Sequence, residues 1–299
     1  MAQLPLDAEI LPPSDDHIFK TLLTRPDAKT VLMDVVSVSI ERTVVDVAVR
    51  NTELPISDVN EKTERFDVNC TVDGGDQVDV EMHSSRIEER ADGHKNFINK
   101  YVYYATDLHS SQQSKGVEYD KLVRTYQVTF CGYTVLPDRR DFVNRASLRF
   151  QDGGQLSDQL NMVIVELSKL NSILKKSVKK LTPLEMWSLF FRYASDPKHR
   201  DLVNSVIRAK EEIDMASKLL MEISKDEQER ARFRSKRMFE TDMISNLIVA
   251  EKRGEKKGEA KGEVKEKERT VRAMRNENMD INTIAKITKL SIDDISKIL

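Results

Sequence analysis

Cysteine is scarce in this sequence, and long apolar runs are absent. The 299 residues include two cysteines, Cys70 and Cys131, and both fall in short apolar runs that are typical of strands. Because small buried thiols are common in such runs, disulfide, redox and zinc chemistry are not expected. No uncharged apolar stretch is long enough to cross a bilayer, and the first residues lack a basic region followed by an apolar run. We therefore expect a cytoplasmic protein without membrane attachment.

An excess of charge of one sign is missing as well. Lysine and arginine total 48 residues, against 50 for aspartate and glutamate. Bulk charge therefore does not predict a nucleic-acid partner, and any DNA binding must be local. The sequence also has no GxxxxGK[ST] phosphate loop and no HExxH pair, so an ATP-driven enzyme and a helix-borne zinc site are not expected.

The order of the apolar patterns predicts an α/β fold. Apolar residues at helical spacing over residues 14–35 predict one or two helices, with a break near Pro26. A second amphipathic stretch predicts a helix between His94 and Lys115 that ends at Gly116. Short β-branched runs bounded by turn signals predict strands at Thr43 to Arg50, Arg65 to Val72, Gln77 to His83 and Thr125 to Leu136.

The second half of the sequence becomes helical. Two more apolar runs, Ala146 to Phe150 and Met162 to Leu167, extend the sheet in our interpretation, although the latter is also consistent with the start of a helix. From Thr182 onward a capping box and helical spacing predict helices, with Trp187 on a core face. We expect three segments: a core over 1–175, a helical extension over 176–250, and a terminal segment over 251–299.

The terminal segment combines a glycine repeat with a small helical hairpin. Glycine recurs at Gly254, Gly258 and Gly262, which predicts a loosely helical linker because each glycine weakens a helix. Beyond it, apolar residues on either side of Ser291 predict two short helices. The second begins with two aspartates, which suit a helix dipole but oppose entry into a DNA groove. We favour an assembly role for this hairpin over base reading.

Two acidic side chains share one face of the predicted hairpin. The turn Asp73-Gly74-Gly75-Asp76 joins the second and third strands, and the two-residue period of a strand puts Asp67 and Glu81 on the same polar face. Converging carboxylates supply hard oxygen ligands for Mg²⁺, which activates water for attack on a phosphodiester. The alternative is an ordinary solvated polar face, because exposed hairpins also alternate in this way.

Several segments carry, in order along the chain, the motifs of a known family. The hairpin reads RFDV, a glycine turn and VEMH, which resembles the D-(spacer)-E-x-Q signature of the PD-(D/E)XK nuclease family transposases, also called recombination-promoting nucleases. Asp16 to Lys20 resembles the family's opening acidic-Phe-Lys motif, and Lys100 to Gly116 resembles its Tyr-rich helix. The tail IAKITKLSIDDISKIL is similar to the usual family ending.

The resemblance implies a fold and an activity. The fold is a restriction-endonuclease-like core, a mixed sheet flanked by helices, followed by a helical C-terminal region. The activity is metal-dependent cleavage of DNA linked to recombination or transposition, with Mg²⁺ as cofactor and DNA as partner. The homo-oligomer that we expect through the C-terminal helices rests instead on the few apolar positions of the terminal hairpin. The residues implied for the site are Asp67, Glu81 and Met82 for the metal, His83 and Asp16 beside them for catalysis, and Lys20 and Lys100 for phosphate.

Two positions depart from the family pattern. His83 stands where the family usually has glutamine and the wider superfamily lysine, and Lys100 stands where arginine is common. A histidine still donates a hydrogen bond or acts as a general base near neutral pH, and lysine keeps the charge but loses the planar contact with phosphate. The alternative function is therefore a catalytically inactive copy, a nuclease-fold module that binds DNA or protein.

Overall fold

A six-stranded mixed sheet lies at the centre of the compact unit formed by residues 1–237. The computed structural model describes residues 3–50, 67–84, 86–112 and 118–299, with the backbone alone over 86–95. The strands lie in the order β1-β2-β3-β4-β6-β5. β3 is parallel to β4 and β4 to β6, whereas the other neighbours are antiparallel. The strands are β1 (Val47–Val49), β2 (Val68–Val72), β3 (Gln77–His83), β4 (Thr125–Cys131), β5 (Val143–Arg149) and β6 (Gln155–Glu166).

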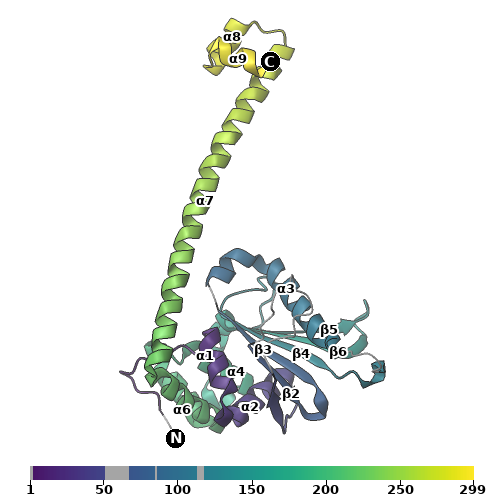
Figure 1. Cartoon of the computed structure of the whole chain (residues 1–299), viewed down its shortest axis with the longest axis vertical. Helices are drawn as coiled ribbons and strands as arrows, with labels where there is room; N and C mark the ends of the chain where they lie inside the picture. Colours follow the sequence, from purple (N-terminus) through teal and green to yellow (C-terminus); the bar gives the residue numbers. More distant parts are fainter. Residues whose placement is uncertain (1–2, 51–66, 85, 113–117) are drawn as a thin grey trace. The chain divides into compact units, whose positions relative to one another are not determined.

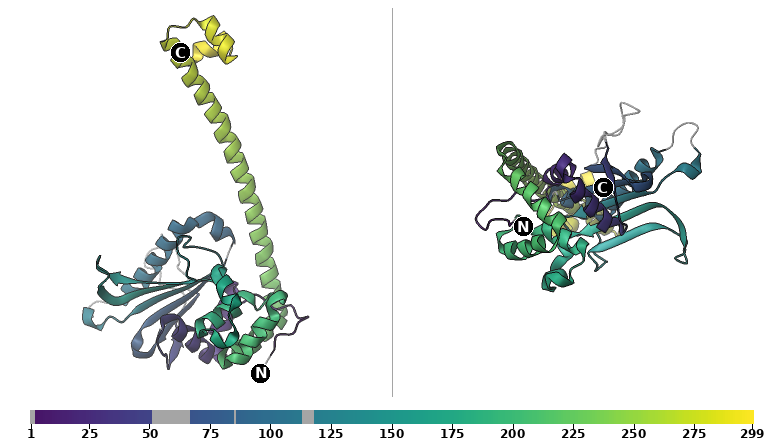
Figure 2. Two further views of the ribbon diagram at one scale, coloured as in Figure 1. Left: turned by 180° about the vertical axis from the view of Figure 1, so that it is seen from behind. Right: turned by 90° about the horizontal axis from the view of Figure 1, so that it is seen from below.

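Helices cover both faces of this sheet, which confirms the predicted mixed sheet flanked by helices. The apolar face, with Val80 and Phe130, packs against helices from both halves of the chain, and α3 lies on the opposite face (Figure 1). Figure 2 shows the sheet between these two layers from other sides. The helices concerned are α1 (Asp16–Thr24), α2 (Lys29–Ile40), α3 (Arg86–Ser110) and α4 (Pro183–Tyr193).

The first helices form where their caps and apolar spacing predict. The Asp15 side chain accepts hydrogen bonds from the backbone amides of His17 and Ile18 and so begins α1. A short 3₁₀ turn starting at Pro26 separates α1 from α2, since proline cannot continue the hydrogen-bond ladder. Phe19 and its neighbours at helical spacing are buried against the sheet. The predicted pair of helices with a break near Pro26 is therefore confirmed.

The predicted capping box is also present in α4. The Thr182 hydroxyl accepts from the Glu185 amide, and the Glu185 carboxylate accepts from the Thr182 amide. Trp187, Phe190 and Phe191 are fully buried in the main core, as expected.

Some expected boundaries are wrong. β1 has three residues, and β4 ends at Cys131 rather than Leu136, although the Gly132 amide still donates to the carbonyl of His83, the last residue of β3. α3 begins at Arg86, before the expected start at His94, and ends at Ser110. The expected stop at Gly116, and the start of the second strand at residues 65 and 66, lie outside the described residues. The runs at 146–150 and 162–167 do extend the sheet, as β5 and β6.

The chain divides into two compact units, Met1–Arg237 and Met238–Leu299. Apolar residues of α4, α5 and α6 share one core with those of α1 and α2 in the first unit. The division expected from the sequence, into 1–175, 176–250 and 251–299, stays a prediction. The remaining helices are α5 (Arg200–Ala209), α6 (Glu211–Lys225), α7 (Glu227–Asn276), α8 (Ile281–Thr288) and α9 (Ile292–Ile298).

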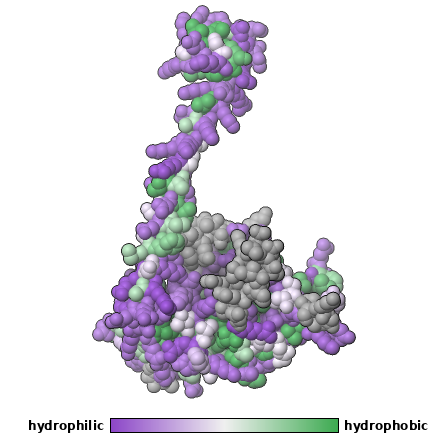
Figure 3. Space-filling model, in the orientation of Figure 1, coloured by the Kyte–Doolittle hydropathy of each residue, from purple (hydrophilic) through white to green (hydrophobic). Residues whose placement is uncertain are grey.

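The glycine repeat lies inside α7, which confirms the helical character of the predicted segment, and its role as a linker stays a prediction. The helix continues through Gly254, Gly258 and Gly262, since strong helix formers separate the glycines. Apolar side chains, including the exposed Phe239 and Val249, occur in its earlier part, whereas the later part is almost entirely hydrophilic (Figure 3).

The predicted helical hairpin at the end of the chain is confirmed. α8 and α9 pack on the end of α7 around a small core of Val271, Ile284 and Ile295. The Ser291 side chain caps α9 by accepting from the Asp294 amide.

Candidate functional site

The strand register brings the two predicted carboxylates together. β2 and β3 are antiparallel, with Val68 opposite Val80, so Asp67 lies next to Glu81 just before β2 begins. The Met82 amide donates to Asp67 Oδ2 at 3.0 Å, and the Asp67 amide donates to Glu81 Oε1 at 3.2 Å. Each side chain thus contacts the backbone of the other strand, which holds both carboxylates at the same end of the hairpin.

This polar face is buried rather than solvated. Glu81 is 7% exposed and Asp79 is fully buried, because α3 covers this side of the sheet. Burial raises the pKa of the Glu81 carboxyl well above its usual value, and the charges of Asp79 and Asp67 raise it further. The alternative of an ordinary solvated hairpin face is therefore excluded.

The donor set fits a hard divalent cation. Asp67 and Glu81 supply adjacent carboxylates, and a cation beside them relieves the repulsion that raises the pKa of Glu81. Over the described part of the chain, no group of three or more His, Cys, Asp or Glu side chains is arranged to hold a metal ion. A site here must therefore combine the two carboxylates with other oxygen donors, such as the carbonyl of Met82.

His83 is enclosed by aromatic rings. The Tyr101 hydroxyl and His83 Nδ1 are 3.1 Å apart, and the rings of Phe97, Tyr101 and Tyr133 surround the imidazole. Burial, and secondarily the charge of Lys100, lowers the pKa of His83 to about 3. The imidazole is therefore neutral at physiological pH. It is able to hydrogen-bond but is too weak a base to accept a proton efficiently there.

Two predicted lysines act on the site through their charge. Lys100 Nζ lies 5.5 Å from the Tyr101 ring centroid and 5.6 Å from that of Tyr104. Burial raises the pKa of Glu81 and that of Asp79, and the positive charges of Lys100 and of Lys20 on α1, respectively, offset part of this rise. Positive charge therefore reaches the carboxylates from both helical layers.

The contacts of Asp16 indicate a structural role that the sequence does not predict. Its carboxylate forms an ion pair with Lys236 of α7, which also contacts Asp15 at 2.9 Å. Nearby, His17 Nε2 lies 2.6 Å from Glu229 Oε2, also on α7. Burial lowers the pKa of His83, and the negative charge of Asp16 offsets part of this fall. The start of α1 is thus both tied to α7 and electrostatically linked to the site.

The prediction from sequence omitted a row of buried polar residues next to Glu81. Asn69, Asp79 and Gln127 lie opposite one another on β2, β3 and β4. The two-residue period already put Asn69 and Asp79 on the face of Asp67 and Glu81. Gln127 stands out as a polar residue inside an otherwise strand-forming run.

One family model matches the chain. The model of the PD-(D/E)XK nuclease family transposases matches residues 13–250. The chain belongs to this family. Searches of the curated proteins and of the solved structures give no match. The resemblance predicted from the hairpin motifs is confirmed, and the PD-(D/E)XK match contains both Asp67 and Glu81. In the described residues, no helix is both long and apolar enough to cross a membrane.

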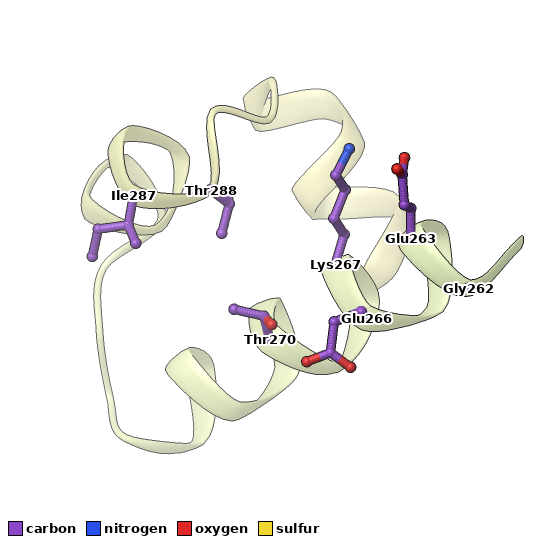
Figure 4. Close-up of a pocket in the computed structure, with 7 residues that line it drawn as sticks. All are labelled: Gly262, Glu263, Glu266, Lys267, Thr270, Ile287 and Thr288. Carbon is purple, nitrogen blue, oxygen red and sulfur yellow. The ribbon is translucent and has the colours of Figure 1, made fainter. Parts of the chain in front are cut away.

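A hollow in the C-terminal unit is separate from these residues. It measures about 460 Å³ and lies between side chains of α7 and α8 (Figure 4). None of the residues predicted for the site lies in it, and it falls beyond the matched range. Its lining residues are Gly262, Glu263, Glu266, Lys267, Thr270, Ile287 and Thr288.

Proposed function

We propose that the protein is a metal-dependent DNA endonuclease that hydrolyses phosphodiester bonds in recombination or transposition. The observation that carries this proposal is the placement of Asp67 beside Glu81 on the buried polar face of the β2–β3 hairpin, where the Asp67 amide donates to Glu81 and the Met82 amide donates to Asp67. Membership of a nuclease-type transposase family supports DNA as the substrate.

Each site residue has a role in this proposal. Asp67, Glu81 and the carbonyl of Met82 hold Mg²⁺, which when bound supplies Lewis-acid stabilisation of the phosphate and an activated water. His83 orients water by a hydrogen bond, since its low pKa makes it a poor proton acceptor. The phosphate contacts fall to Lys20 and Lys100, whose charge already acts on the carboxylates. Asp16 assists by its position at the start of α1.

The first prediction tests the paired carboxylates. Asp67→Ala and Glu81→Ala are each expected to lower Mg²⁺-dependent cleavage of plasmid DNA by at least about a hundredfold, because ligands of one metal act as a unit. Both variants should fold, since neither side chain belongs to the apolar core. The matched control is Glu118→Ala, a surface carboxylate that forms an ion pair with Lys121. Cleavage by Glu81→Ala at the control rate contradicts the mechanism.

A second function is favoured by the environment of His83. The His83 ring, at the position of the family's glutamine, is 3% exposed and enclosed by aromatic rings, and a side chain this closed off from solvent fits a catalytically inactive module that keeps DNA or protein binding. Calorimetric titration with Mg²⁺ separates the two functions, because only the nuclease needs a cation at the carboxylates. Binding that disappears in Asp67→Ala favours the nuclease, whereas absence of binding in the unmodified protein favours the inactive module.

A further inference from the structure

A row of three polar side chains crosses the centre of the sheet beside Glu81. Asn69 on β2 lies opposite Asp79 on β3, and Asp79 lies opposite Gln127 on β4. Their exposed fractions are 4%, 0% and 1%, so the row is closed to solvent. Side chains directly opposite on neighbouring strands are in contact range, and alternation puts this row on the same face as Glu81.

The hydrogen bonds of this row are incomplete. Gln127 Nε2 donates to Asp79 Oδ2 at 2.6 Å. No donor within the described residues reaches Asn69 Oδ1, Asp79 Oδ1 or Gln127 Oε1, although all three atoms are buried. Buried acceptors are normally satisfied, and three in one row indicate a missing positive or donating group.

A cation accounts for the row better than a water molecule or a proton. One water has two hydrogens and leaves at least one of the three acceptors without a donor. A proton on Asp79 Oδ1 makes that oxygen a donor to one neighbouring acceptor, and it still leaves the third oxygen without a donor. A single cation accepts lone pairs from all three oxygens at once.

We propose that Asn69, Asp79 and Gln127 form a second, inner cation site, with Glu81 as the carboxylate shared between it and the Asp67–Glu81 pair. Two carboxylates and two amide oxygens make an oxygen-only set with a charge of about −2, which suits a hard divalent ion. Because the site is dry, Mn²⁺ and Ca²⁺ are preferred over Mg²⁺, which keeps several of its waters.

The inner site differs from the proposed metal site in its ligands and in its role. It shares Glu81 with that site, but the binding of its cation does not depend on DNA cleavage. Its cation would join β2, β3 and β4 at the row next to Glu81. The inference therefore predicts two bound cations in each chain, one of which persists when Asp67 is neutralised.

Counting bound Mn²⁺ tests this inference on the full-length protein. The loss of the free-ion electron paramagnetic resonance signal during titration should give two equivalents for the unmodified protein. Asn69→Leu keeps the side-chain volume but removes the amide oxygen, so this variant should lose the inner Mn²⁺ and retain the one at the Asp67–Glu81 pair. Asp67→Asn should lose the Mn²⁺ at that pair and retain the inner one. Thr71→Val, on the same face but outside the ligand set, is the control and should keep two. If Asn69→Leu does not fold, Gln127→Met replaces it.

The outcomes distinguish this inference from the proposed function. A single equivalent that is lost in Asp67→Asn and kept in Asn69→Leu overturns the inner site and leaves the outer site intact. Two equivalents that Asn69→Leu and Gln127→Met both keep also overturn the inner site. Absence of Mn²⁺ binding by the unmodified protein overturns both. As an independent readout, Ca²⁺ should raise the melting temperature of Asp67→Asn but not that of Asn69→Leu.

Discussion

His83 illustrates how burial changes the chemistry of a single residue. Its sequence position suggests a group that titrates near neutral pH, but the ring lies among Phe97, Tyr101 and Tyr133 and stays neutral. A neutral imidazole and a glutamine amide both orient water by hydrogen bonding. The departure from the family's glutamine is therefore smaller than the residue types indicate.

A three-variant comparison tests this role of His83. His83→Gln is expected to keep or raise the rate of Mg²⁺-dependent plasmid cleavage, because it restores the usual family residue. His83→Ala should lower the rate by about tenfold, which corresponds to the loss of one hydrogen bond. Equal rates for the unmodified protein and both variants remove His83 from the mechanism.

The same histidine predicts a pH dependence of stability. The folded pKa of about 3 lies below the ordinary 6.5, so between these values the unfolded chain binds a proton that the folded chain does not. Stability from this residue is therefore present above pH 6.5 and is lost as the pH falls towards 3. Between pH 7.5 and 5.5 the loss is about 1.4 kcal/mol.

Urea unfolding with chelator at both pH values measures this effect. His83→Gln should lose about 1.4 kcal/mol less free energy of unfolding than the unmodified protein over that interval. The raised pKa values of Asp79 and Glu81 act in the opposite direction, but they are present in both proteins and largely cancel. An identical pH dependence in the two proteins contradicts a depressed pKa at His83.

At the scale of elements, alternation and capping residues predict much of the fold. They identify β3 and the start of α4 closely, and they put Asp67 and Glu81 on one face. Alternation does not reveal what covers that face, so burial by α3 and the row through Gln127 depend on tertiary packing. The early part of α3, from Arg86 to Gly93, lacks apolar spacing and was missed for that reason.

The three glycines of α7 give a prediction about the stability of this helix. A Cβ added at Gly254, Gly258 or Gly262 meets no atom within 4 Å, so alanine fits each position. Each replacement should stabilise the helix by roughly 1 kcal/mol. The triple variant should show slower hydrogen exchange over residues 250–266, and Ala260→Gly should show faster exchange. Unchanged exchange in both variants contradicts a regular helix in this segment.

At the scale of the whole molecule, most of the second compact unit, Met238–Leu299, lies outside the range that the family model matches. The match ends at residue 250, and the small core of α8 and α9 lies beyond it. Ile287, Ile292 and Leu299 of this hairpin are each at least half exposed. A core this small gains stability from further apolar burial, which is consistent with the proposed assembly role.

Deletion of residues 251–299 tests the assembly role. The truncated protein is expected to contain fewer chains per particle than the full-length protein, as measured by light scattering, because the exposed apolar positions are removed. Its affinity for duplex DNA should change only modestly, since the aspartates at the start of α9 do not suit a DNA groove. A mass of one chain for both proteins, together with lost DNA binding, shows instead that the hairpin reads DNA.

The spacing of the site residues along the chain has a consequence for protein synthesis. Asp67 and Glu81 are 14 residues apart and joined by a tight turn, whereas Gln127 lies 48 residues beyond Asp79. Closing the short loop has the lower entropic cost, and domains begin to fold as they emerge from the ribosome. We expect the two paired carboxylates to assemble while β4 is still untranslated, so a nascent chain has the outer ligands before the inner row exists.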